Sequence, residues 1–153
     1  MKRNLRIAMV SHCVLNQNSV LSDWERGRGA FKSIVQELLD EDLAIVQLPC
    51  PELMYLGVGR PPMNYEDYDT PEFRICCELM LKPTVIQIAK LVESGCSIDV
   101  LVGIENSPNC DLNPGKGVFM EVLMELLPTD AMIHSKRMVP EKYLECECPL
   151  ALI

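Results

Sequence analysis

The stretch IDVLVGI, at residues 98–104, decides the fold class of this chain. It is rich in Val, Ile and Leu, and it is too short for a typical buried helix. Two similar runs occur at residues 5–10 and 43–48, and each run is followed within a few residues by Ser, Pro or Asn. Continuous apolar runs of this kind are typical of parallel strands covered on both faces. The sequence therefore predicts parallel strands at all three places.

Helical patterns separate and follow these strands. A helix is expected to begin between residues 24 and 30, since the apolar residues from 31 to 39 fall on one face. A capping Thr and a Pro open a second helix at residues 70–94, in which Pro83 should cause a kink or a division into two helices. A third one-faced helix is expected at residues 118–127.

The remaining segments complete a three-layer arrangement. Residues 11–22 and 53–69 are expected to be loops, the second long enough for a lid or binding loop. A fourth strand is expected at residues 131–134 and a last short helix at 140–145. Strands that alternate with helices predict an α/β fold, a three-layer Rossmann-like domain with a mainly parallel sheet of about four strands. Residues 1–153 are predicted to form this single domain.

Charge and hydropathy exclude several classes of function. The chain has 14 Lys and Arg against 22 Asp and Glu, a net charge of −8, and no basic run, so nucleic acid is not expected as its main partner. No apolar stretch approaches the roughly 18 residues that span a membrane. The apolar part of the N-terminus is too short for a signal peptide, which favours a cytoplasmic location. The 8 cysteines then indicate metal or redox chemistry rather than a disulfide framework.

Three cysteines lie just beyond the predicted strands: Cys13, Cys50 and Cys110. Ligands of open α/β sheets bind outside the carboxyl ends of the strands, so these thiols are expected to meet at one rim. Thiolates favour zinc, cuprous copper or iron–sulfur clusters, and the paired Cys-x-x-Cys spacing that is common in structural zinc sites is absent. The sequence predicts a cluster or metal with three protein ligands and an open fourth position, although a buried cysteine also serves as a small hydrophobe.

Polar neighbours of these cysteines could carry catalysis. Glu52 follows Cys50 closely and could act as a general base, although an acid in the first turn of a helix is an equal alternative. Ser107 could donate a hydrogen bond to substrate or sulfur, or serve only in a turn. Further candidates for contact with the substrate flank the cysteines or lie in the 53–69 loop: Ser11, His12, Arg60, Tyr65 and Asn106.

At these positions the sequence resembles the thiouracil desulfidase family and its related domains. The resemblance rests on Ser11-His12-Cys13, Cys50-Pro51-Glu52 and Ser107-Pro108-Asn109-Cys110, in the family's order. The chain departs from the family at residues 14–20, where many members have a Gly-containing stretch ending in Arg-Tyr-Asp-Gly. It also has Asp111 where Gly is usual. The chain therefore resembles a divergent subgroup.

The resemblance implies a [4Fe-4S] cluster on Cys13, Cys50 and Cys110, with the fourth iron open. It also implies non-redox removal of sulfur from a thiocarbonyl compound, such as a thiolated pyrimidine-like heterocycle, with Glu52 and Ser107 as the catalytic or substrate-contacting positions. The main alternative is an iron–sulfur or metal-binding sensor or sulfur carrier, without desulfidase activity.

Two further possibilities concern a role for the C-terminal cysteines and an enzyme mechanism that needs no metal. Cys146 and Cys148 lie one residue apart, and they could chelate metal or accept sulfur, or simply belong to a tail. In a metal-free thiol enzyme, Cys13 would attack the substrate beside an oxyanion-binding loop closed by arginine. The first arginine after Cys13 is Arg26, which disfavours this mechanism.

Overall fold

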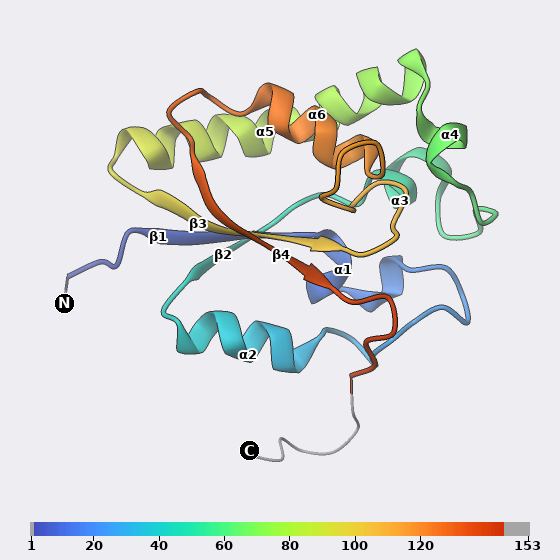
Figure 1. Ribbon diagram of the computed structural model, residues 1–153, viewed down its shortest axis with the longest axis horizontal. Coiled ribbons are helices and arrows are strands. Elements are labelled where there is room, and N and C mark those ends of the chain that lie inside the picture. The colour runs from blue at the N-terminus through green and yellow to red at the C-terminus, as the bar shows by residue number, and fades with distance from the viewer. Residues whose placement is uncertain (1, 146–153) are drawn as a thin grey trace.

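A four-stranded, all-parallel sheet forms the centre of the computed structural model, which describes residues 2–145 (Figure 1). The strand order is β2-β1-β3-β4. The strands are β1 (Arg6–Val10), β2 (Ala44–Gln47), β3 (Ser97–Ile104) and β4 (Ile133–Val139). The predicted α/β class, the parallel sheet and the number of strands are confirmed.

Helices cover both faces of the sheet and produce the three layers. Helix α2 (Lys32–Asp40) lies on one face, and α5 (Pro71–Glu93) and α6 (Val118–Leu126) lie on the other (Figure 1). Strand β1 shows why its sequence is continuously apolar. Ile7 and Met9 pack into the core with α5 and α6, whereas Ala8 and Val10 pack into the core with α2. Each strand residue thus faces one of two buried cores.

Several short helices lie in segments that the sequence predicts as loops. They are α1 (His12–Leu15), the 3-10 turn η1 (Gln17–Ser19), α3 (Pro51–Leu56) and α4 (Tyr65–Tyr68). Each is too short to show a helical period, and local capping starts α3 and α4. Pro51 occupies the first turn of α3, and the Asn64 side chain accepts from the Asp67 amide in a capping box.

Helix α5 is continuous through Pro83, so of the two predicted outcomes, a kink or a division into two helices, the division is wrong. Proline removes the hydrogen bond to the carbonyl of Leu79. Leu79 and Pro83 both lie on the solvent side of α5, where water can satisfy that carbonyl. No helix within residues 2–145, α5 included, is long and apolar enough to cross a membrane.

The segment after β4 is not the short helix predicted at residues 140–145. It makes a turn and then runs extended, because it is held by the rest of the chain. The amide of Glu145 donates to the carbonyl of Arg26 at 2.8 Å, and the Tyr143 ring packs edge-on against Phe31. Strand β4 is also longer than predicted, since its exposed polar residues Ser135 and Lys136 pair along β3. Cys146 and Cys148 lie outside the described residues.

Candidate functional site

The topology creates a crevice at the carboxyl end of the sheet. From β1 the chain moves outward to β2, and it then returns past β1 to form β3 on the other side. Connections therefore leave β1 and β3 in opposite directions, and such a switch point is where open α/β sheets bind ligands. Cys13 lies in the helical turn directly after β1, Cys50 caps α3 after β2, and Cys110 lies in the loop after β3.

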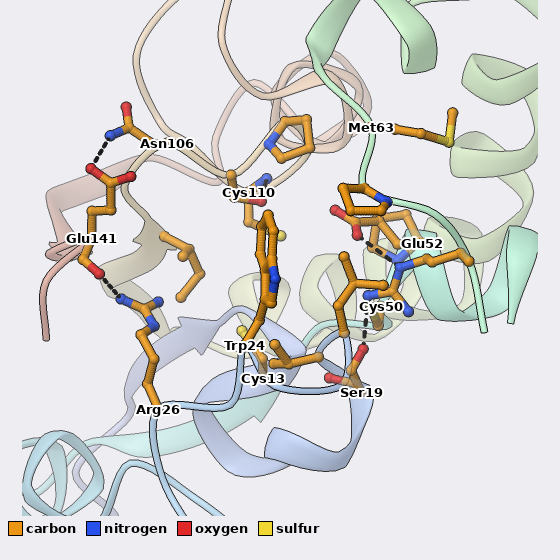
Figure 2. A pocket seen from close by; sticks show the side chains of 18 of the residues that line it. Cys13, Ser19, Trp24, Arg26, Cys50, Glu52, Met63, Asn106, Cys110 and Glu141 are labelled. Carbon is orange, nitrogen blue, oxygen red and sulfur yellow. Dashed lines mark hydrogen bonds and ion pairs between the residues drawn. The ribbon is translucent and has the colours of Figure 1, made fainter. Parts of the chain in front are cut away.

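The structure brings these three cysteines together in one cavity of about 330 Å³ (Figure 2). Their thiols are close enough for mutual charge effects: ionisation of Cys13 or Cys50 would raise the pKa of Cys110. Glu52, Arg60 and other polar residues share the cavity wall with mainly apolar side chains. The three thiols, far apart in sequence, thus face one pocket.

Burial keeps these thiols protonated in the metal-free chain. It raises the pKa of Cys13 to about 12, raises that of Cys50, and raises that of Cys110 well above its usual range. The charges of Arg26 and Arg60 act in the opposite direction on Cys13 and Cys50, but they are outweighed by desolvation. A thiol with so high a pKa is a poor nucleophile at neutral pH, which disfavours the metal-free thiol mechanism.

The three thiols are the candidate metal ligands of this cavity. Within residues 2–145, no three side chains of His, Cys, Asp or Glu close into a shell for one ion. A cubane cluster is larger than an ion and holds its thiolates further apart, so the three cysteines remain compatible with a cluster. Thiols lose their protons when they bind a metal, and the iron of a cluster would stabilise the resulting thiolates.

Glu52 is held from two sides at the edge of the cavity. The Nε of Arg60 donates to one carboxylate oxygen at 3.0 Å, and the side-chain amide of Asn109 donates to the other at 3.1 Å. The carbonyl oxygen of the buried Asn109 side chain has no hydrogen-bond partner among the described residues, so its orientation is set by Glu52. Each carboxylate oxygen retains a lone pair that can accept from water.

Arg60 is buried, and each of its three guanidinium nitrogens donates a hydrogen bond to a neighbouring group. Besides Glu52, it donates to the carbonyls of Gly57 and Ser19, at 3.1 and 2.9 Å. The structure therefore places Arg60 in the cavity wall, as a partner of Glu52 rather than a free cation for substrate. This role requires the planar, forked guanidinium group.

Replacing Arg60 with alanine should destabilise the protein by about 3 kcal/mol, because it leaves a carboxylate without its charged partner in a mostly buried place. Urea denaturation measures this change. Arg137→Ala is the matched control, since it breaks partly exposed pairs with Glu41 and Glu37 and should cost much less. Equal effects of the two substitutions would contradict the role given to Arg60.

The loop after β3 presents Cys110 and Ser107 to the cavity. The Ser107 hydroxyl oxygen accepts from the amides of Cys110 and Asn109, at 3.0 and 3.4 Å, and its proton remains available for donation into the cavity. Asp111 is buried and accepts from the amide of Asn106 at 2.8 Å. Thus Asp111, which the resemblance marks as unusual, stabilises this loop.

Two glycines allow this loop to pack against the sheet. A Cβ atom at Gly103 would lie 2.5 Å from the carbonyl oxygen of Cys110, and one at Gly117 would lie 2.1 Å from that of Asp111. Both distances are far below van der Waals contact. Backbone atoms cannot yield as a flexible side chain can, so only glycine fits at these places.

Substituting Gly117 with alanine should therefore displace the Cys110 loop, lower stability by about 2–3 kcal/mol and disturb any metal site that includes Cys110. Thermal unfolding measures the first effect, and iron content after anaerobic preparation measures the second. Gly59→Ala is the control, because a Cβ atom there meets nothing within 4 Å. Unchanged iron content in the Gly117 variant would mean that the loop tolerates the displacement.

Three predicted candidates lie outside the cavity wall. Ser11 is fully buried and donates to the carbonyl of Val102 at 3.0 Å. Both ring nitrogens of His12 are engaged: Nδ1 donates to the carbonyl of Leu48 at 3.1 Å, and Nε2 accepts from Asn16 at 3.1 Å. The Tyr65 hydroxyl donates to Glu121 on α6, so it does not close over the cavity. His12 and Tyr65 support the framework of the site, whereas Ser11 also forms a hydrogen bond to the Cys110 side chain that acts to lower the pKa of that thiol.

Asn106 lies in the wall and bonds to a distant segment. Its left-handed backbone, with φ of 60°, turns the chain after β3, and its side-chain amide donates to Glu141 at 2.8 Å. The Arg26 guanidinium donates to the carbonyl of Glu141 at 2.9 Å (Figure 2), and it also lies over the Phe31 ring. Asn106 and Arg26 thereby join the cavity rim to the segment after β4.

The sequence interpretation missed the wall formed by the loop after η1. This loop contributes Val20, Leu21, Trp24 and Arg26 to the cavity, and the opposite side includes Pro62 and Met63. The available signal was the single tryptophan, which lies in a segment predicted to lack regular structure, because tryptophan side chains are highly buried on average.

Together the fold and the site define a class of protein, an α/β domain with a three-cysteine cavity at the switch point of a parallel sheet. No family model matches the chain, and no solved structure matches it. It is 45% identical over 116 residues to the uncharacterised protein MJ0003 of Methanocaldococcus jannaschii, a match that covers 76% of this chain and 74% of that protein. The chain belongs to the same family as MJ0003.

Proposed function

We propose that this protein is a desulfidase that removes sulfur from a thiocarbonyl group of a small heterocycle, with a [4Fe-4S] cluster bound by Cys13, Cys50 and Cys110. The overall reaction is hydrolytic: a C=S group and water give a C=O group and hydrogen sulfide, with no change in oxidation state. The proposal includes a cytoplasmic location and excludes nucleic acid as the main partner. It places the chain in a divergent subgroup similar to the thiouracil desulfidases.

The observation that carries the proposal is the meeting of three partly buried thiols beside a carboxylate and a hydroxyl in one cavity. The cysteines would hold three irons of the cluster, and no fourth cysteine lines the cavity among the described residues. When bound, the cluster would supply an open iron that acts as a Lewis acid toward the thione sulfur. Arg26 and Arg60 would offset part of the negative charge of the three thiolates.

The chain's own groups supply the proton transfers. Glu52 would accept a proton from the water that attacks the thiocarbonyl carbon, and Arg60 and Asn109 would keep its carboxylate turned toward that water. Ser107 would donate its hydroxyl proton in a hydrogen bond to the charge that develops on the substrate. The apolar part of the wall would exclude bulk water and strengthen both interactions.

Anaerobic incubation with 2-thiouracil tests the proposal. The expected result is uracil and sulfide in equal amounts, without an added reductant. A protein that contains the cluster but converts neither 2-thiouracil nor other thiolated heterocycles would instead be a sensor or a sulfur carrier. That outcome would reject the enzymatic part of the proposal and retain the cluster.

A further inference from the structure

Trp24 lies at the mouth of the cavity with 60% of its side chain exposed. It is the only tryptophan of the chain. Figure 2 shows its indole among the side chains that line the cavity with Cys13 and Cys110. In the part of the chain that the structure describes, no aromatic ring and no cation packs on this indole. A large apolar face at a cavity mouth is therefore available to a ligand.

Hydrogen bonds connect the loop that carries Trp24 to helix α1, which contains Cys13. The buried Gln17 side chain donates to the carbonyl of Cys13 at 2.7 Å and accepts from the amide of Arg26 at 2.9 Å. The amide of Trp24 donates to the carbonyl of Leu21 at 3.0 Å, which closes a turn just before the indole. Hydrogen bonds on both sides therefore fix the position of Trp24 relative to Cys13.

The wall beyond the indole suits a flat ligand with polar groups on its edge. Pro62, Met63 and Pro108 supply apolar surface, whereas Glu52 and Ser107 supply an acceptor and a donor. Conjugated heterocycles combine an apolar face with polar edges, and they stack on aromatic side chains. Saturated or acyclic compounds with the same polar groups have no such face.

We propose that Trp24 selects the substrate by stacking on the face of a planar, conjugated ring, an inference that rests on the proposed function and deepens it. The thiocarbonyl group is then an edge substituent of that ring, which turns it toward the cysteines while the ring covers the indole. Acyclic thioamides and thioureas would lack this contact and would be poor substrates.

Binding of unreactive ligands tests the inference without turnover. Titration of the anaerobically prepared protein with uracil should change the fluorescence of the only tryptophan. Calorimetry should give a Kd that rises about tenfold in Trp24→Leu, in line with the loss of one stacked base, and by less than about threefold in Trp24→Phe, which retains a ring. Dihydrouracil, which has the same carbonyl groups on a puckered ring, should bind weakly and equally to the wild-type protein and Trp24→Leu.

Tyr55→Leu is the control, because it removes another exposed aromatic residue, one outside the cavity wall, and should leave the Kd unchanged. Equal uracil affinity in Trp24→Leu and wild type would overturn the inference, as would the absence of binding by uracil, cytosine and hypoxanthine alike. If the wild type converts 2-thiouracil while Trp24→Leu binds uracil normally, only this inference fails. If uracil stacks on Trp24 but the protein holds no iron and sulfide, the proposed function fails.

Discussion

Replacing Cys50 with serine should abolish cluster binding, and the anaerobically prepared variant should be colourless. The proposed site has three protein ligands, so the loss of one leaves two thiolates for a cluster that already has an open iron. The same result is expected for Cys13→Ser and Cys110→Ser, since all three thiols line the same cavity. Iron and acid-labile sulfide should fall together, to less than about a tenth of the wild-type content.

Cys76→Ala and Cys96→Ala are the matched controls for this experiment. Both residues are free, partly buried cysteines, and neither lines the cavity. Their variants should retain the wild-type iron content. A Cys50→Ser protein that folds and still binds full iron would remove Cys50 from the ligand set, and thermal unfolding shows whether the variant has folded.

Replacing Glu52 with glutamine should leave the cluster in place and reduce kcat by about 10²- to 10⁴-fold, the usual contribution of a general base. Glutamine retains the size of the side chain and can still accept from Arg60 or Asn109, but it cannot take a proton from water. The measurement is the rate of uracil release from 2-thiouracil, with iron content determined on the same sample.

The control for Glu52 comes from the same cavity. Glu105 lines the wall, and its carboxylate accepts from the amide of Glu141 at 2.8 Å, away from Arg60 and Asn109. Glu105→Gln should therefore retain nearly full activity. If Glu52→Gln turned over at the wild-type rate, the base would have to be another group.

The sequence predicted the elements that bury apolar surface. The runs at residues 5–10, 43–48 and 98–104 form β1, β2 and β3 within one residue at each end, and the α5 and α6 boundaries are equally close. A parallel sheet then required the three strand-end cysteines to share a rim. These features follow from hydrophobic periodicity, which is a local property of the sequence.

Side-chain direction and distant contacts could not be predicted in this way. His12 is adjacent to Cys13, but neighbouring residues of a helical turn point about 100° apart, and His12 turns toward the end of β2 instead. The loop that carries Trp24 is held at the cavity by a hydrogen bond between Gln17 and Arg26. Asn109 donates to Glu52, although the two residues are 57 positions apart in the sequence. Such contacts depend on how the loops pack over the finished sheet.

The metal and sulfide content of the anaerobically prepared wild-type protein decides whether Cys13, Cys50 and Cys110 hold a cluster. A [4Fe-4S] cluster on these cysteines predicts a brown protein with about four iron atoms and about four acid-labile sulfides per chain. A colourless protein that contains zinc, or no metal at all, would contradict it.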